Sequence, residues 1–573
     1  MARPGAIYPQ VEPTAGALID RAVMACPPAR RVTAALEAAL RAGAQVVVIG
    51  PGAAVRREEL HRAARWGLGR LPIAALAWRA LPTLSARASE IDARRHLMTG
   101  APMVLVRDGG RVVGVIDSER LALARPAFSL AHRLERLEAR GSDAALWLCR
   151  VAGKVGEGLG VQVFAVGGFV RDLLLERRAP DLDLLVEGDG VAFARRLVEE
   201  VGGSLVVHPD FGTASIEGAG RAALGRVDIA SARRERYDAP GALPVVSASS
   251  AEDDLARRDF SVNAMAMALS PSAFGRLLDP LGGQRDLKRR RLKPLSPLSF
   301  VEDPTRIFRA ARYAARLGFR LDPGGVRALA LALAVGRYPA LSGQRLLAEV
   351  ELLAAEASGW RGFELVLKWE ALRLWDRGFR VSARGSGRLR DARRLCAWGE
   401  RERIALDHAE VALIALLLDQ RPAVASRCLT RLALTGGRLA RLRQSATEAA
   451  ALARRLDGEG GRRPSEVAAM LERRPEAVLV GTWLLGRGRT RRRLQWFWSR
   501  GRGTRPLLSG DDIVALGARR GPEVGACLAA LRQRRLDGAL TTVAEERAFV
   551  KRWLGGRASR RGLWGTRDKR RSV

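Results

Sequence analysis

The chain has 573 residues, which is long for a single hydrophobic core, so several domains are expected. Hydrophobic residues make up 47% of the sequence, which excludes a wholly disordered chain, and no apolar run approaches the ~20 residues of a membrane-spanning helix. The formal net charge of +36, nearly all of it from arginine, favours a polyanionic partner such as a nucleic acid.

The N-terminal stretch lacks the apolar core of a signal peptide, so a cytoplasmic location is expected. The five cysteines lie far apart without a Cys-x-x-Cys pair, which argues against a zinc site and against a disulfide framework. Buried, reduced thiols are therefore predicted at Cys26, Cys149, Cys396, Cys428 and Cys527.

Residues 1–22 carry little signal, whereas residues 23–125 contain a weak internal repeat. Each copy has an amphipathic stretch, an apolar strand, a glycine-containing turn and a second helix start. The apolar strands lie at 46–49 in the first copy and at 103–106 in the second. The repeat resembles a tandem pair of CBS modules, most clearly in the turn and strand from Gly109 to Asp117.

The CBS resemblance implies an adenosine nucleotide between the two copies, or a homodimer formed through them. CBS modules that hold a nucleotide usually carry Ser or Thr and, three residues later, Asp. This chain has Arg56 and Glu59 in the first copy and Asp117 and Arg120 in the second. That departure favours a dimerising or spacer module whose ligand site has been lost.

A helical linker is expected at 126–154, followed by a glycine turn that the rest of the chain is organised around. The apolar run 161–166 leads into Gly167 and Gly168, and a helix-like pattern follows. Strand, tight turn and helix start are indicated, and the two glycines let backbone N–H groups approach an anion. This turn is a candidate phosphate cradle.

Two carboxylates follow on one short strand. The alternation Asp-Leu-Asp-Leu places Asp181 and Asp183 on one face and directs Leu182 and Leu184 into a core. At ~3.3 Å per residue the acids are about 7 Å apart, close enough to share divalent cations for two-metal phosphoryl transfer. The alternative is a surface strand that happens to carry two acids.

In this order the two features resemble the signature of polymerase-beta-like nucleotidyltransferases. The segment 167–172 is similar to the first motif of their class II branch, which comprises tRNA nucleotidyltransferases and bacterial poly(A) polymerases. The resemblance implies two Mg²⁺ ions at Asp181 and Asp183, and a triphosphate facing the glycine turn and Arg171. It also implies a third catalytic carboxylate on a neighbouring strand, for which Asp228 is the candidate; a strand-edge acid without metal is the alternative.

A second motif lies at 257–263. If this segment is helical, Asp259 and Asn263 share a face and together can bind vicinal ribose hydroxyls. The segment resembles the class II Arg-Arg-Asp-x-x-x-Asn motif, which implies selection of ribonucleotides. Arg258 is placed where it can meet a phosphate.

A third motif begins at Glu302. Acids followed by arginines suit a helix macrodipole, which is the simplest interpretation. The resemblance implies more: Asp303 and Arg306 read the edge of the incoming base, so protein replaces a template. Arg309 and Arg312 continue the same face as candidate phosphate or RNA contacts.

The expected fold is a multidomain α+β protein. A CBS pair precedes a polymerase-beta-like head at 155–290 with a small mixed sheet, and an all-helical remainder follows. That remainder comprises a neck with the base-selecting helix at 291–350, a body at 351–504, an RNA-contacting module at 505–555 and a basic tail at 556–573.

The first functional hypothesis is template-independent addition of CMP and AMP, or of AMP alone, from CTP and ATP to the 3′ end of tRNA. A poly(A) polymerase is the second, although the chain lacks the Gly-Arg/Lys-Arg/Lys-Phe signature of the bacterial enzymes. The third is an inert, nucleotide-sensing RNA-binding protein, against which the intact acids and motif spacing argue.

Overall fold

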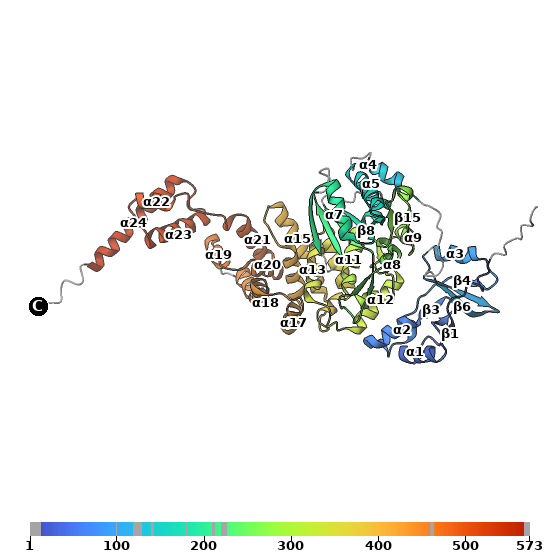
Figure 1. Cartoon of the computed structure of the whole chain (residues 1–573). Coiled ribbons are helices and arrows are strands. Elements are labelled where there is room, and N and C mark those ends of the chain that lie inside the picture. Colours follow the sequence, from blue (N-terminus) through green and yellow to red (C-terminus); the bar gives the residue numbers. More distant parts are fainter. Residues whose placement is uncertain are drawn as a thin grey trace, which may run out of the picture. The chain divides into compact units, whose positions relative to one another are not determined.

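The computed structural model describes residues 13–98, 100–117, 129–138, 143–177, 181–208, 212–218, 226–458 and 463–565 (Figure 1). The chain divides into two compact units: Met1–Glu349 with Lys368–Arg377, and Val350–Leu367 with Gly378–Val573. Within the described ranges, no helix combines the length and the apolar character needed to cross a bilayer.

The internal repeat is confirmed at the N-terminus of unit 1. Each copy forms a three-stranded sheet in which the first strand is parallel to the second and the second is antiparallel to the third. The elements are β1 (Val23–Ala25), α1 (Val32–Arg41), β2 (Val46–Gly50), β3 (Ala53–Arg56) and α2 (Arg57–Ala63), then β4 (Thr83–Ser85), α3 (Glu90–Met98), β5 (Met103–Asp108) and β6 (Arg111–Asp117).

The residues that a CBS ligand would need are used to join the two copies. Arg56 donates to both carboxylate oxygens of Asp117, at 3.2 and 3.1 Å, and Arg21 pairs with the same buried carboxylate. Glu59 accepts from the Arg56 backbone N–H and from the Trp78 indole. These contacts favour a structural role for the pair; Arg120 lies outside the described residues.

The linker expected at 126–154 contains two helices, α4 (Ala131–Glu138) and α5 (Asp143–Gly158), of which α5 continues beyond the expected boundary and packs on β7. Close packing at its middle requires a glycine, because a Cβ at Gly153 would lie 1.9 Å from the Leu269 carbonyl oxygen. The linker therefore forms part of the head's outer layer.

The head is built on a mixed seven-stranded sheet of order β15-β14-β7-β8-β11-β10-β9. Among the pairings described in it, only β8 with β11 is parallel, so these central strands run side by side in the same direction. The strands are β7 (Gln162–Val166), β8 (Asp181–Glu187), β9 (Ser204–His208), β10 (Thr213–Glu217), β11 (Arg226–Ser231), β14 (Ala266–Ala268) and β15 (Leu277–Leu278).

The sequence explains why β8 lies at the centre. Leu182 and Leu184 are buried, as their alternation predicted, and Leu185 and Val186 are buried too, since both faces of the sheet are covered. Helix α7 (Gly190–Val201) packs on β10 and β11, and the Asp189 side chain caps its start by accepting from two backbone N–H groups. This core holds the exposed end of β8 in place.

Short elements connect the sheet to the neck. Strands β12 (Arg233–Arg236) and β13 (Val245–Ala248) form a separate hairpin. The others are α6 (Gly168–Leu174), α8 (Ala251–Ala256), α9 (Gly283–Lys288), β16 (Arg291–Leu292), α10 (Ser299–Glu302), α11 (Thr305–Leu317), β17 (Arg320–Leu321), α12 (Pro323–Val335) and α13 (Gly343–Ala355).

A short later segment, Lys368–Arg377, belongs to unit 1. Its Trp375 ring stacks on Phe308 of α11, with centroids 6.4 Å apart and planes 7° from parallel. Both rings are buried, so this contact supports the helix that carries Arg306 and Arg309.

Unit 2 is helical throughout its described residues, as expected from the sequence. Helix α24 extends through Gly565, so the boundary predicted at 555/556 falls inside a helix; residues 566–573 lie outside the described part. The helices are α14 (Gly359–Lys368), α15 (Ala383–Arg401), α16 (His408–Leu417), α17 (Pro422–Arg431), α18 (Gly436–Asp457), α19 (Pro464–Leu471), α20 (Glu476–Leu485), α21 (Gly488–Trp496), α22 (Gly510–Ala515), α23 (Pro522–Leu536) and α24 (Val543–Gly565).

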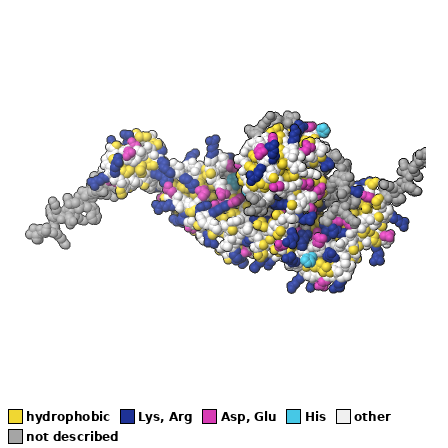
Figure 2. All heavy atoms as spheres, viewed as in Figure 1, with side chains coloured by type: hydrophobic (Ala, Val, Ile, Leu, Met, Phe, Trp, Pro, Cys, Tyr) yellow, Lys and Arg dark blue, Asp and Glu magenta, His cyan; other side chains and the backbone are white. Residues whose placement is uncertain are grey.

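Charge and thiols follow the sequence prediction. Figure 2 shows Lys and Arg side chains over the visible surface, with fewer Asp and Glu among them. All five cysteines are free and buried. Burial alone raises the pKa of the Cys149 thiol to about 12, which keeps it protonated and unreactive.

Candidate active site

The glycine turn has the conformation that its sequence predicted. Gly167 follows β7 with φ 68° and ψ −126°, and α6 begins at the next residue. A Cβ at Gly167 would lie 2.9 Å from Arg258 Nη1 and 3.4 Å from the Asp183 Oδ2 atom. Only glycine therefore lets the backbone come this close to a cation and a carboxylate.

Asp181 and Asp183 open into the same cavity as the glycine turn. The cavity has a volume of about 670 Å³ and is lined by residues from all three sequence motifs. Asp181 is exposed and Asp183 is half-buried. Burial, then the charges of Asp228 and Asp181, raise the pKa of Asp183, and the Arg258 guanidinium opposes that rise.

Asp228 lies opposite Asp183 on the parallel strand β11, as expected for a third carboxylate. Its Oδ1 accepts from the Ser215 hydroxyl at 2.6 Å and from Arg226 at 2.8 Å. Within the described ranges, no three acidic, histidine or cysteine side chains are close enough together to hold a metal ion. Asp228 lines the cavity together with Asp181 and Asp183, and its Oδ1 is already engaged by Ser215 and Arg226.

Asp259 and Asn263 meet without forming one helix, contrary to the helical prediction. Helix α8 ends at Ala256, because the buried Phe260 adopts an extended backbone, and a 3-10 turn follows at Ser261–Asn263. The two side chains still touch: Asn263 Nδ2 donates to Asp259 Oδ1 at 3.1 Å. The two side chains therefore do lie together, but a 3-10 turn and not a helix brings them there.

Two arginines hold this pair. Arg309 Nε donates to Asp259 Oδ2 at 2.8 Å, and Arg171 Nη1 donates to Asn263 Oδ1 at 2.7 Å. Burial opposes ionisation of Asp259, but Arg309 and Asn263 outweigh it and lower its pKa. The carboxylate therefore stays ionised beside the cavity and can accept hydrogen bonds there.

Arg171 was expected to face a triphosphate, but its donors point elsewhere. Nε and Nη2 form a bidentate pair with Asp172, at 2.9 and 2.8 Å, and the side chain is buried. Arg258 is the guanidinium beside the glycine turn, where Asp254 orients it through two hydrogen bonds of 3.2 and 3.0 Å. Arg171 lines the cavity too, and its described hydrogen bonds go to Asp172 and Asn263.

Asp303 lies in the break between α10 and α11, with an extended backbone. Its Oδ1 accepts from the Thr305 N–H at 3.0 Å and from the Thr305 hydroxyl at 2.7 Å. Arg345 Nη2 lies 2.9 Å from the same oxygen. The carboxylate is thus fixed at the entrance to α11, and it lines the cavity.

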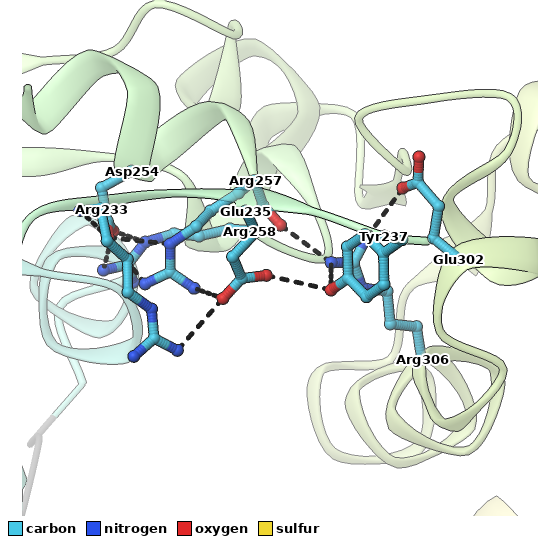
Figure 3. A network of polar contacts seen from close by, with 8 residues as sticks. All are labelled: Arg233, Glu235, Tyr237, Asp254, Arg257, Arg258, Glu302 and Arg306. Carbon is cyan, nitrogen blue, oxygen red and sulfur yellow. Dashed lines mark hydrogen bonds and ion pairs between the residues drawn. The ribbon is translucent and has the colours of Figure 1, made fainter. Parts of the chain in front are cut away.

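Arg306 is buried and held by several acceptors (Figure 3). It donates to the Ser299 hydroxyl at 2.8 Å, the Arg257 carbonyl at 2.9 Å and the Tyr237 hydroxyl at 3.3 Å. Tyr237 in turn donates to Glu235 at 3.0 Å. The network connects α11 to the segment that carries Arg257 and Arg258.

The chain is similar to several known proteins. The model of the Poly A polymerase head domain matches residues 163–293. An A-adding tRNA nucleotidyltransferase of Geobacter sulfurreducens is 36% identical over 60% of this chain and 41% of its own length. A CC-adding tRNA nucleotidyltransferase of Deinococcus radiodurans is 33% identical over 68% of this chain and 89% of its own length.

This chain belongs to the tRNA nucleotidyltransferase family. The chain spans about half or less of the length of three A-adding relatives. Among solved structures, a Thermotoga maritima CCA-adding enzyme complexed with tRNA is 27% identical with a TM-score of 0.61, over 75% of this chain and all of that one. None of these comparisons speaks for the CBS resemblance of the N-terminal pair.

The cavity also contains residues that the sequence analysis did not single out. Tyr313 is the clearest, because four guanidinium groups lie 5.2–5.6 Å from its ring: those of Arg171, Arg309, Arg312 and Arg316. The available signal in the sequence was that Tyr313 follows Arg309 by four residues, which puts both on one face of a helix. Tyr237, Arg345 and Glu349 also line the cavity, but they come from distant segments and no local pattern marks them.

Proposed function

We propose that this protein adds AMP, with or without CMP, to the 3′ end of tRNA by template-independent phosphoryl transfer from ATP and CTP. The observation that carries the proposal is a single cavity lined by three motifs from distant stretches of the chain. The glycine turn with its two acids, the Asp259–Asn263 pair and the Asp303–Arg306 pair correspond to phosphate, ribose and base of one nucleotide. The A-adding relatives support AMP as the added unit.

Asp181 and Asp183 fit a pair of Mg²⁺ ions in donor type and placement. Carboxylate oxygens are ligands that Mg²⁺ prefers, and the raised pKa of Asp183 reflects a buried negative charge that a cation would stabilise. When bound, the metal ions would activate the attacking hydroxyl and stabilise the charge of the leaving diphosphate. Asp228 would act on the charge of Asp183 from the neighbouring strand.

The triphosphate would lie along the glycine turn. Backbone N–H groups at the start of α6 approach it from one side, and Arg258 supplies a guanidinium from the other. Arg171 would hold Asn263 rather than phosphate. Arg309 and Arg312, on the cavity wall, would meet phosphate or the RNA end.

The ribose would replace the contact between Asn263 and Asp259. Each side chain keeps its second partner, Arg171 or Arg309, so both are already oriented when the sugar arrives. A carboxylate that accepts and an amide that donates match two neighbouring hydroxyl groups. A deoxyribonucleotide would leave one of these buried polar groups without a partner.

The base would be read by Asp303 and Arg306. Thr305 and Arg345 contact Asp303 through Oδ1, so Oδ2 is the oxygen proposed to accept from an exocyclic amine. Arg306 would exchange one of its protein acceptors for the base edge. Adenine and cytosine both carry such an amine, whereas uracil does not.

The tRNA would also contact the C-terminal module, whose separate core includes Ile513, Cys527, Leu531 and Val550. Helix α23 begins after Gly521, which has φ 105°, and carries Pro522 in its first turn. Exposed Arg519 and Arg520 precede that start. Free N–H groups and guanidinium groups together suit a backbone phosphate.

For the N-terminal pair we propose a spacer role. Arg56 and Asp117 already pair across the two copies, and Glu59 accepts from the Arg56 backbone and from Trp78, which disfavours an adenosine nucleotide at that place. A homodimer through these modules stays a prediction, and size-exclusion chromatography with light scattering would test it.

Incorporation of single nucleotides tests the proposed function. Purified protein and Mg²⁺ are incubated with tRNAs that end before the first C, after one C and after both, and with an unrelated oligonucleotide. One AMP on the tRNA that ends in CC is expected, and CMP on the shorter tRNAs would show the complete activity. Long tails on any RNA would favour a poly(A) polymerase, and unchanged incorporation by Asp181→Ala would contradict this catalytic site.

A further inference from the structure

A second cavity, of about 580 Å³, lies between the N-terminal pair and the neck within unit 1. Residues 78–82 and 100–102 form one side, and residues 285–293 and 322–327 contribute the other. The two cavities share no lining residue. The proposed transfer reaction makes no use of this second cavity.

Its walls carry an excess of positive charge. Two carboxylates, Asp286 and Asp322, face six basic side chains: Arg79, Arg285, Arg289, Arg291, Lys293 and Arg327. The formal excess is therefore four positive charges, without counting His96. Both carboxylates already have hydrogen-bond partners, because Asp286 accepts from the Ser261 hydroxyl at 2.6 Å and Asp322 caps α12.

The basic groups also repel one another. Burial, followed by the charge of Arg79, lowers the pKa of Arg327. Burial also lowers the pKa of Lys293; the charge of Asp286 opposes this effect and Arg285 adds to it. In the described part of the chain, the buried Nε of Arg285 makes no hydrogen bond and lies 3.5 Å from Asp286 Oδ1, in a long ion pair. An excess of like charges gathered around a cavity indicates an anion site.

The cavity walls are fixed in place before any ligand binds. Lys293 Nζ donates to the Gly100 carbonyl at 3.3 Å. A Cβ at Gly100 would lie 2.5 Å from the Leu281 carbonyl group, so the two backbones are in close contact there. Arg62 and Glu302 form a further ion pair between module and neck. Because the site is preformed, ordering its side chains costs less free energy when a ligand binds.

We propose that this cavity binds a small anion that carries two or more phosphate groups. Each phosphate ester carries about −1.5 to −2 charges near neutral pH, so two or three would balance the excess of four. Guanidinium groups pair with phosphate through two parallel hydrogen bonds. Trp78, Pro102 and Pro323 give an apolar wall for the remainder of such a molecule.

Hydrogen exchange with inorganic tripolyphosphate as the probe tests this site in the full chain. In wild-type protein, tripolyphosphate is expected to slow exchange in peptides covering 78–82 and 322–327. The double variant Arg79→Gln/Arg327→Gln should need at least 10-fold more tripolyphosphate for the same protection. Arg41→Gln/Arg70→Gln removes the same charge from exposed positions outside the cavity and should behave as wild type.

Protection at 167–172 in all three proteins reports the active-site cavity separately, and thermal melting confirms that each variant is folded. Equal loss of protection in both double variants would show only non-specific attraction and would overturn the proposal. A second result would also overturn the proposal. If Arg79→Gln/Arg327→Gln kept the tripolyphosphate protection of wild type but bound tRNA 10-fold more weakly, the cavity would be an RNA contact.

Discussion

Asp183 and Asp228 lie directly opposite each other on the two parallel strands β8 and β11. Their negative charges interact, and together with burial this raises the pKa of Asp183. The pairing brings acids from positions 45 residues apart in the sequence to one end of the sheet. An arrangement that costs stability yet places charge at a cavity is typical of functional sites.

Asp183→Asn should lose at least 100-fold in nucleotide incorporation and gain thermal stability. Because the folded pKa is raised, the native state is destabilised where Asp183 is ionised, above that pKa, and the cost disappears as pH falls below it. In EDTA the variant should therefore melt higher than wild type at pH 8, with a difference that shrinks as the pH falls through the folded pKa of Asp183. Glu199→Gln, on the exposed face of α7, should change neither property.

Addition of Mg²⁺ should raise the melting temperature of wild type and narrow its difference from Asp183→Asn. An equal rise in both proteins would mean that Asp183 is not a metal ligand.

Gly167→Ala should reduce incorporation at least 10-fold and destabilise the protein by about 1–2 kcal/mol, the cost of a left-handed backbone for alanine. Its new Cβ would also displace Arg258, from which it would lie 2.9 Å. Gly202→Ala provides the matched control, because Gly202 has a similar φ of 72° and open space around its Cβ position. Similar loss of activity in both variants would remove the special role of Gly167.

Asn263→Ala should reduce discrimination between ATP and dATP, measured as the ratio of kcat/KM values, by at least 10-fold. The amide that would bind a ribose hydroxyl is removed, and Asp259 keeps Arg309 and the Phe260 backbone N–H as partners. Ser261→Ala alters the same 3-10 turn, but this hydroxyl contacts Asp286 on the other side. An unchanged ratio in Asn263→Ala would exclude Asn263 from sugar selection.

Arg306→Lys should increase incorporation of UTP and GTP relative to ATP and lower stability by about 1–3 kcal/mol. A lysine cannot satisfy Ser299 and the Arg257 carbonyl as the planar guanidinium does. Single-nucleotide incorporation and urea unfolding would measure the two effects. Arg316→Lys, also on α11 but exposed, should retain both base choice and stability.

Asp117→Asn should destabilise the N-terminal pair by about 2–3 kcal/mol and leave AMP addition unchanged. The substitution removes the buried charge that pairs with Arg21 and Arg56. Faster hydrogen exchange in β6 and β3 would report the loss. Asp108→Asn, exposed at the end of β5, should have no effect, and a large fall in activity with Asp117→Asn would argue against a spacer.

Much of the head could be predicted because its signals are local. Alternation in Asp181–Val186 sets which face of β8 is buried, and a glycine pair after an apolar strand indicates a turn. The helix considered across Asp259–Asn263 does not form, for a non-local reason. Phe260 packs against Phe300 and Tyr313, and this packing favours an extended residue where the sequence spacing suggested a helix.

The partners of Arg171 and Asp303 were equally hidden from the sequence. Arg171 is held by Asn263, 92 residues later, and Asp303 by Arg345, 42 residues later. Such pairs depend on how separate segments pack, which periodicity does not encode. The motifs identified the chemical groups, and the tertiary structure determined which of them are already engaged.

The stacking of Trp375 on Phe308 decides how this chain can be shortened. A fragment that stops at Glu349 would keep every side chain of the active-site cavity yet leave the underside of α11 exposed to water. Extending the fragment to Arg377 restores that aromatic cover. The minimal catalytic piece is therefore expected to end after the tryptophan, beyond the last residue that touches a nucleotide.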